Sequence, residues 1–325
     1  MNLFTVKQLK GQARSILSET TPPYRNLVLL HSLVYAAAQL VLFLLGMLTE
    51  SMMAGTGGLS GMGTRAMLST AESVLSFAAD ILLPFWQLGI LYTTLLVLSR
   101  QQVNFSMLTR GVRRFGPLLR YMIVYGLIAT AVSLAVMNVM SFVVLILPVP
   151  EEMMQVMAKL EPDMLMDPVA LLKLLPVEEL TQWLLLTSVL MFAALLIVMV
   201  YLGQRLRFGY YLILDDQTDR ALEAVFMSFH MTKGAVWQCL KLDLSFWWYT
   251  LLGMLPTAFI FSRWLFPAMG IDLPIAPGML QLLGLCISYG LELLLVWWAG
   301  AHIEVTKACA YQWLLPRVLQ KPNPQ

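Results

Sequence analysis

The sequence predicts an all-α, polytopic membrane protein, and its composition and hydrophobic runs are the observations that predict this class. Hydrophobic residues make up 59% of the 325 residues, charged residues make up 12%, and the mean hydropathy is +0.73. Soluble domains are about 45–50% apolar and about 25% charged. The three cysteines are odd in number and lack C-x-x-C spacing, so they indicate neither a disulfide framework nor a zinc site.

Six hydrophobic runs have the length of about 20 residues that a transmembrane helix needs. We expect the six spans at residues 27–48, 74–98, 118–147, 183–204, 246–267 and 279–301. The first run begins after 25 mostly polar residues and has no small-residue cleavage site behind it. It is therefore predicted to be a span and not a cleavable signal peptide.

The distribution of basic residues predicts the orientation. All but four of the 21 Lys and Arg residues fall on one side of the six spans, the exceptions being Arg65, Lys159, Lys173 and Arg263. Basic loops stay in the cytoplasm, so both termini are predicted to be cytoplasmic. Residues 148–180 then form an outer loop rich in Pro, acidic residues and Met. Met153, Met154, Met157 and Leu160 favour a short helix on the outer leaflet. The alternative is a soft-metal site formed by Met154, Met157, Met164 and Met166, which is disfavoured because no His lies nearby.

Three amphipathic segments are expected to lie in the membrane interface on the cytoplasmic face, at residues 3–18, 104–116 and 219–234. Their apolar stripes are Val6, Leu9, Ala13 and Ile16; Phe105, Leu108, Val112 and Phe115; and Leu222, Val225, Phe226 and Phe229. Asn104 and Asp219 are the expected N-caps of the second and third helices, and Gly234 is expected to end the third.

Each amphipathic segment contains a basic residue followed by glycine, at Lys10-Gly11, Arg110-Gly111 and Lys233-Gly234. This pattern is compatible with three repeated hairpins, each introduced by an interfacial helix. Basic residues at headgroup depth also suit the phosphates of anionic lipids. The candidate phosphate contacts are Arg110, Arg113, Arg114, Arg207 and Lys233.

A second group of candidates consists of polar side chains within or beside the predicted spans. Glu292 lies deepest, Asp80 and Arg263 have similar depth and form a plausible pair, and Arg205 and His31 lie near inner span ends. An ionisable group in the bilayer costs about 2.5–3.5 kcal/mol, so it usually has a partner or a function. Glu292 is therefore either a proton or cation site in a transport path or a buried structural hydrogen-bonding group.

The sequence motifs that resemble catalytic or metal-binding sites are incomplete or misplaced. Gly58-Leu59-Ser60-Gly61 matches the G-x-S-G motif of intramembrane serine proteases, but it lies in a predicted outer loop. The three histidines lie on the cytoplasmic half, which is too far away for one of them to act as the base for Ser60. His302-x-Glu304 is not a zinc-binding H-E-x-x-H motif. We therefore expect no catalytic residues, no metal site and no cofactor.

Residues 207–246 carry a family resemblance. They read RFGYYLILDDQTDRALEAVFMSFHMTKGAVWQCLKLDLSF, with matching positions Tyr210, Asp215, Glu223, Ala224, Ser228, Lys233, Gly234, Leu242, Asp243, Leu244, Ser245 and Phe246. This region resembles a family of bacterial, largely Gram-positive, integral membrane proteins of unknown function. The resemblance implies a six-span protein of the bacterial cytoplasmic membrane and supplies no activity. The tail Thr306-Lys307-Ala308-Cys309-Ala310-Tyr311 resembles the family's last motif, and Ala301 and His302 stand where the family carries Pro-Tyr ahead of that threonine.

The function expected from these observations is non-enzymatic. The chain is expected to be transporter-like or to handle a small molecule or lipid, with a membrane-embedded scaffold or partner subunit of a larger complex as the alternative. Its expected partners are the lipid bilayer, anionic lipids at the cytoplasmic face, and a further protein or a second copy of the chain. No nucleic-acid partner is expected.

Asp243 and Ser245 are predicted to cap the helix of the fifth span.

Overall fold

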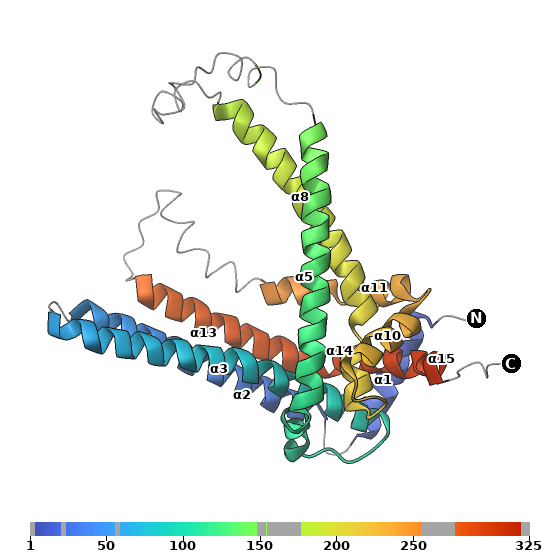
Figure 1. The fold of residues 1–325 in the computed structure, drawn as a ribbon. Coiled ribbons are helices and arrows are strands. Elements are labelled where there is room, and N and C mark those ends of the chain that lie inside the picture. Colours follow the sequence, from blue (N-terminus) through green and yellow to red (C-terminus); the bar gives the residue numbers. More distant parts are fainter. Residues whose placement is uncertain are drawn as a thin grey trace. The chain divides into compact units, whose positions relative to one another are not determined.

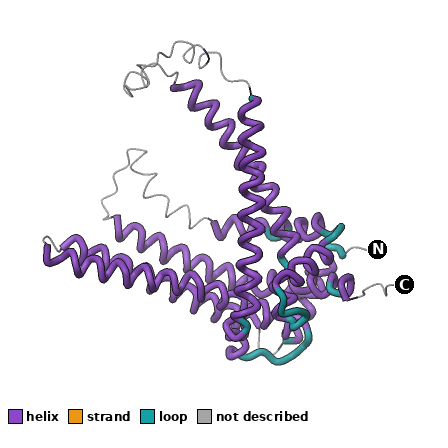
Figure 2. Tube along the Cα trace, in the orientation of Figure 1, coloured by secondary structure: helices purple, strands orange, loops and turns teal. Residues whose placement is uncertain are grey.

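The computed structural model describes residues 4–20, 24–55, 59–147, 154, 177–254 and 277–319. Within these ranges all regular secondary structure is helical, as predicted (Figure 2). Most of the predicted outer loop 148–180, including its candidate metal-binding Met residues other than Met154, lies outside the described residues. The same holds for the second half of the predicted span 246–267.

The helices follow one another along the chain as Figure 1 shows. They are α1 (Val6–Glu19), α2 (Tyr24–Gly55), α3 (Leu59–Leu98), η1 (Phe105–Thr109), α4 (Arg110–Arg113), α5 (Phe115–Ile146), α8 (Val177–Leu206), α9 (Gly209–Leu214), α10 (Ala221–Thr232), α11 (Val236–Leu244), α13 (Pro277–Leu295), η3 (Val296–Gly300), α14 (Ala301–Leu314) and α15 (Pro316–Leu319).

Five described helical stretches are long and apolar enough to cross a membrane, judged by length and composition. They are Tyr24–Met47, Ser69–Leu98, Phe115–Val144, Thr181–Leu214 and Leu282–Leu319. Each overlaps one of the six predicted spans, and together with the composition they indicate a membrane-embedded protein. The last stretch differs from the prediction, because helix continues past Ala301 through α14.

The chain forms two compact units, one made of Met1–Met122 with Arg207–Gln325 and the other of Ile123–Leu206. The second unit contains most of α5 and α8, in which few side chains are buried by protein. Within it, the Ser133 hydroxyl donates to the Met199 sulfur at 3.5 Å. Helices that are apolar on all sides and unburied by protein are suited to contact with lipid.

In the first unit, α2 and α3 lie side by side and α13 lies along α2 (Figure 1). The Tyr24 hydroxyl at the start of α2 hydrogen-bonds the Thr94 hydroxyl near the end of α3 at 2.6 Å. The core concentrates at this end, around α14, where Val305, Ala308 and Ala310 are fully buried. The small residues of α14 permit the close helix packing that the core needs.

Helix α1 confirms the predicted first amphipathic helix but not its expected environment. Thr5 caps it in a capping box with Gln8. Its apolar face packs against α14, where Leu9 and Ala13 are fully buried. Lys10 donates from Nζ to the Ser245 carbonyl at 3.2 Å. The stripe therefore faces protein, and bilayer contact is not needed to bury it.

The second amphipathic segment is not one helix over 104–116. It consists of the 3₁₀ turn η1 and the single turn α4, and Phe115 already begins the long helix α5. Asn104 occupies the N-cap position, but its side chain makes no capping hydrogen bond. Short 3₁₀ pieces of this kind commonly serve as connectors.

The third amphipathic helix, α10, is capped differently from the prediction. Thr218 accepts from the Arg220 amide at 3.1 Å and donates to Glu223 at 2.8 Å, while Asp219 forms an ion pair with Arg114. Gly234 has a φ of 74°, which confirms the predicted left-handed residue after the helix.

The face of α10 that packs on protein combines small side chains with Val225 and Met231. Ala224 and Ser228 are fully buried, whereas Leu222 and Phe226 of the predicted apolar stripe are 60% and 67% exposed. This exposure does not contradict the predicted place of the stripe in the membrane interface, where lipid would cover these side chains. Leu222 and Phe226 remain available to lipid.

The three basic–glycine pairs do not mark one repeated structural feature. Gly11 lies in α1 with open space around it, and Gly234 supplies a left-handed turn. Gly111 instead lies against the backbone of α3, where an added Cβ would stand 2.2 Å from the Phe85 carbonyl oxygen. The three glycines therefore have different physical roles, which removes the dipeptide as support for a repeat.

Candidate functional site

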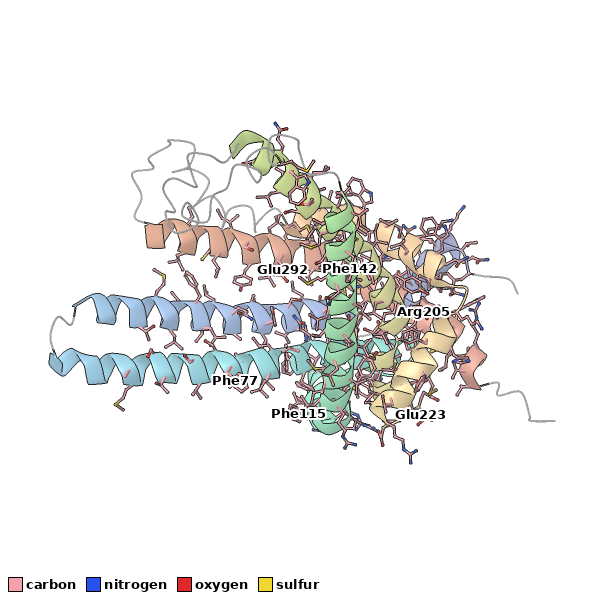
Figure 3. The ribbon with its side chains drawn as sticks, turned by 45° about the horizontal axis from the view of Figure 1, so that its top comes forward. Phe77, Phe115, Phe142, Arg205, Glu223 and Glu292 are labelled. Carbon is pink, nitrogen blue, oxygen red and sulfur yellow. The ribbon has the colours of Figure 1, made fainter. Side chains whose placement is uncertain are left out.

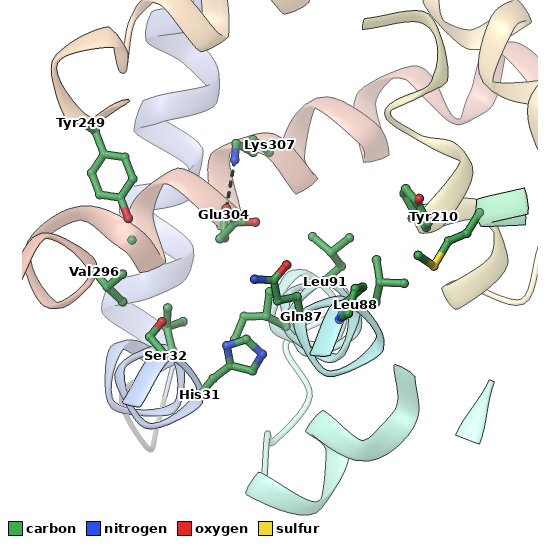
Figure 4. A pocket seen from close by; sticks show the side chains of 15 residues that line it. His31, Ser32, Gln87, Leu88, Leu91, Tyr210, Tyr249, Val296, Glu304 and Lys307 are labelled. Atoms are coloured by element: carbon green, nitrogen blue, oxygen red, sulfur yellow. Dashed lines mark hydrogen bonds and ion pairs between the residues drawn. The ribbon is translucent and has the colours of Figure 1, made fainter. Parts of the chain in front are cut away.

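The candidate site is a pocket of about 510 Å³ in the first unit, between α2, α3 and the last helical run (Figure 4). Ligand pockets commonly measure about 300–1,000 Å³. Polar side chains from five parts of the chain line it, namely His31, Ser32, Gln87, Tyr210, Tyr249, Glu304 and Lys307. Leu88, Leu91 and Val296 supply part of its apolar wall. The pocket thus combines an apolar wall with several hydrogen-bonding groups.

Glu304 and Lys307 form the charged part of the pocket. They lie one turn apart on α14, and Lys307 Nζ donates to Glu304 Oε1 at 3.0 Å (Figure 4). Their side chains are 22% and 32% exposed. The second carboxylate oxygen, Oε2, has no hydrogen bond to a described residue. A carboxylate can accept about four hydrogen bonds, so this group retains unused acceptor capacity.

His31 is held in place on α2 by a reciprocal contact with Trp86 of α3. Its Nε2 lies 2.9 Å from the Trp86 carbonyl oxygen, and Trp86 Nε1 donates to the His31 carbonyl oxygen at 3.3 Å. The two rings stack with centroids 5.3 Å apart. Such contacts fix the imidazole plane, and His31 Nδ1 makes no hydrogen bond to a described residue. The ring is therefore positioned at the wall with one nitrogen unused.

A π-helical segment adjoins the pocket. The segment η3, Val296–Gly300, connects α13 with α14, and both its terminal residues line the pocket. π-helical turns are rare and occur frequently at functional sites, because the wider turn displaces the following side chains. Here the segment precedes Glu304 by one turn.

The described part of the chain places only some of the predicted intramembrane site residues. Of the five, His31 lines the pocket. Glu292 lies on α13 (Figure 3), where it is exposed and makes no hydrogen bond or ion pair with a described residue. Arg205 belongs to the second unit, where it lies over Tyr201. The side chain of Asp80 and the whole of Arg263 lie outside the described residues.

Sequence reasoning missed Glu304, Lys307 and Gln87. It ended the last span at Ala301, which placed Glu304 and Lys307 in a terminal tail. The signal that could have found them is their spacing, since opposite charges three residues apart share one face of a helix. Gln87 carries no formal charge and has no distinctive sequence signal.

Three of the five candidate lipid-phosphate residues are paired with carboxylates in the first unit. Arg207 Nη1 donates to both oxygens of Asp243, at 3.1 and 3.2 Å. The other contacts are Arg110 with Asp216 at 3.3 Å and Arg114 with both Asp216 and Asp219. Arg113 and Lys233 are exposed and form no ion pair within the described ranges. They are the better placed of the five for contact with phosphate.

The predicted capping roles of Asp243 and Ser245 are wrong. Asp243 lies in the last turn of α11 and pairs with Arg207, and Ser245 follows that helix as its C-cap. The Ser245 hydroxyl donates to the Leu242 carbonyl at 2.6 Å. The LDLSF sequence therefore ends one helix before the next begins.

The acidic turn after α9 has a structural role. Tyr311 of α14 donates its hydroxyl proton to Asp215 at 2.9 Å, and its ring stacks on Tyr211 with centroids 5.2 Å apart. Asp216 of the same turn pairs with Arg110 and Arg114. These contacts connect the turn with both α14 and the η1–α4 segment.

The described residues contain no cluster of three or more His, Cys, Asp or Glu that could hold a metal ion. Cys239 and Cys309 are buried and Cys286 is exposed. Burial raises the pKa of the Cys239 thiol to about 11, so this group is protonated at neutral pH.

Comparison with protein-family models, with curated proteins and with solved structures finds no match. The resemblance of residues 207–246 to a bacterial membrane protein family therefore stays a prediction.

Proposed function

We propose that the chain is a six-span membrane protein with both termini in the cytoplasm, and that it binds a small polar ligand or a lipid headgroup in the pocket around Glu304. Its role is transporter-like or lipid-handling and non-enzymatic. The observation that carries this proposal is the pocket itself, in which Glu304, Lys307 and His31 meet beside a π-helical segment.

The surroundings of the pocket support a position near the inner membrane surface. Arg25 lies over the Trp297 ring at 3.8 Å, and Trp248 and Trp298 have ring centroids 5.0 Å apart. Tryptophan concentrates at membrane–water interfaces, and basic residues concentrate on the cytoplasmic side. A pocket at this level is open to headgroups and to solutes of the cytoplasm.

The terminal segments support the proposed even number of spans. Helix α1, near the start of the chain, packs against α14, near its end. Both therefore lie at the same end of the first unit, which is the arrangement that six crossings require. The proposed fifth span is supported by the hydropathy of residues 246–267, of which residues 247–254 are described and helical.

Native mass spectrometry of protein gently extracted from its own membrane tests the pocket as the binding site. We expect a co-purifying lipid or small molecule whose occupancy falls about tenfold or more in Glu304→Gln, because a charge-assisted hydrogen bond is lost. The matched control is Glu292→Gln, which neutralises the exposed carboxylate of α13 outside this pocket and should retain the ligand.

The opposite pattern, loss in Glu292→Gln and retention in Glu304→Gln, would move the site back to the position predicted from sequence. A stoichiometric protein partner whose binding neither substitution changes would favour the alternative function of a membrane-embedded partner subunit.

A further inference from the structure

The pocket is lined by one negatively charged and one positively charged side chain, so its formal charges cancel. Glu304 and Lys307 are the formally charged side chains among its described lining residues, apart from the titratable His31. They form a partly exposed pair, and such pairs contribute only about 0–1 kcal/mol to stability. The pair therefore contributes little to stability, but it places one negative and one positive group at defined positions in the pocket.

The negative side of the pair suits an ammonium group. Glu304 Oε1 accepts from Lys307, while Oε2 accepts no hydrogen bond from a described residue. A primary ammonium carries three N–H donors, and a hydrogen bond between two ions is stronger than one between neutral groups. A quaternary ammonium has no N–H and cannot form this bond.

The positive side suits an anion. Lys307 uses one of its three N–H groups on Glu304. The Gln87 amide and the Tyr249 hydroxyl line the same pocket and hydrogen-bond none of the described residues. In Figure 4 the Gln87 amide lies between His31 and Glu304. These groups provide additional N–H and O–H donors for a phosphate or carboxylate.

We infer that the pocket takes a zwitterion in which a primary ammonium binds Glu304 and a phosphate or carboxylate binds Lys307. This inference rests on the proposed function and specifies its ligand. A ligand of one charge would give the pocket a net charge, which is costly in a partly desolvated site, whereas a zwitterion leaves the charges balanced. The zwitterion has two sources, a phosphatidylethanolamine headgroup or a free solute of the same chemistry.

The test uses the full chain in nanodiscs that contain equal parts of phosphatidylethanolamine, phosphatidylcholine and phosphatidylglycerol. Native mass spectrometry counts the lipids that stay bound, and thermal shift with glycerophosphoethanolamine and with glycerol phosphate tests free solutes. The variants are Glu304→Gln, Lys307→Met and the charge-swapped Glu304→Lys/Lys307→Glu. Glu19→Gln is the control, because Glu19 pairs with Arg100 on the exposed end of α1. Thermal unfolding first establishes that every variant is folded.

We expect the wild-type protein and Glu19→Gln to retain phosphatidylethanolamine, or to bind glycerophosphoethanolamine, about tenfold or more over the other probes. The two single variants should lose this preference. The charge-swapped variant should keep it, because it still presents both charges. Retained lipid identifies the headgroup as the source, and response to glycerophosphoethanolamine alone identifies a free solute.

Equal or stronger retention of phosphatidylglycerol or phosphatidylcholine, still sensitive to Glu304→Gln, would overturn the zwitterion and leave the pocket as a binding site. Probe binding that neither single variant changes would overturn both the zwitterion and the proposed function.

Discussion

Replacement of Gly89 by alanine is expected to destabilise the first unit by about 3 kcal/mol, at the upper end of the usual cost of overpacking. A Cβ at this position would stand 1.9 Å from the Leu108 carbonyl oxygen and 2.8 Å from the Leu108 carbonyl carbon. Both are backbone atoms, so no side chain can rotate to relieve the clash. Helix α3 and the η1 turn must separate instead. Thermal unfolding in detergent, followed by tryptophan fluorescence, measures the loss.

The control for this substitution is Gly11→Ala. Gly11 is exposed in the middle of α1, and no atom lies within 4 Å of its added Cβ. Alanine is better than glycine in a helix interior by up to about 1 kcal/mol, so this variant should be as stable as the wild type or more stable. Equal unfolding temperatures for the two variants would contradict the close approach of α3 and η1.

Replacement of Asp243 by alanine is expected to cost about 2 kcal/mol of unfolding free energy. The Arg207 and Asp243 side chains are 15% and 35% exposed, so the pair lies between an exposed ion pair and a buried one. The substitution leaves a largely buried guanidinium without its carboxylate. The double variant Arg207→Met/Asp243→Ala should be less destabilised than the sum of the single variants, as a double-mutant cycle would measure.

The exposed pair of Arg100 with Glu19 provides the comparison. Its N–O distance is 3.2 Å, close to that of the Arg207 pair, but its side chains are 73% and 49% exposed. Glu19→Ala should therefore change stability by less than about 1 kcal/mol. A cost for Asp243→Ala as small as that for Glu19→Ala would mean that Arg207 is not held by this carboxylate.

Structural features that depend on a short stretch of sequence could be predicted from the sequence alone. Five of the predicted spans correspond to long apolar helices, since the hydropathy of about 20 consecutive residues decides each one. The left-handed Gly234 was predictable for a similar reason, because many helices end at a residue with a positive φ, which glycine adopts without strain.

Properties that depend on distant residues were not predictable in this way. Asp243 was expected to cap a helix, yet its partner Arg207 lies 36 residues earlier in the chain. The face of α10 that is buried by protein, which includes Ala224, Val225 and Ser228, was not predictable either. Hydrophobicity alone does not distinguish a face that meets lipid from one that meets protein.

The candidate site was predicted only in part. His31 lines the pocket as an intramembrane polar residue of the kind expected, but Glu292 does not. The carboxylate that lines the pocket belongs to Glu304, which follows the predicted end of the last span at residue 301. The helix continues from α13 through α14 and so extends past Glu304, which pairs with Lys307 in the wall of the pocket.

The binding of a zwitterion in the pocket is tested most directly by a cryo-electron microscopy structure of the protein in nanodiscs made from lipids that include phosphatidylethanolamine. We expect non-protein density in the pocket, in contact with both Glu304 and Lys307 and bounded by His31 of α2. A pocket closed by its own side chains, or ligand density at Glu292 with none at Glu304, would contradict it.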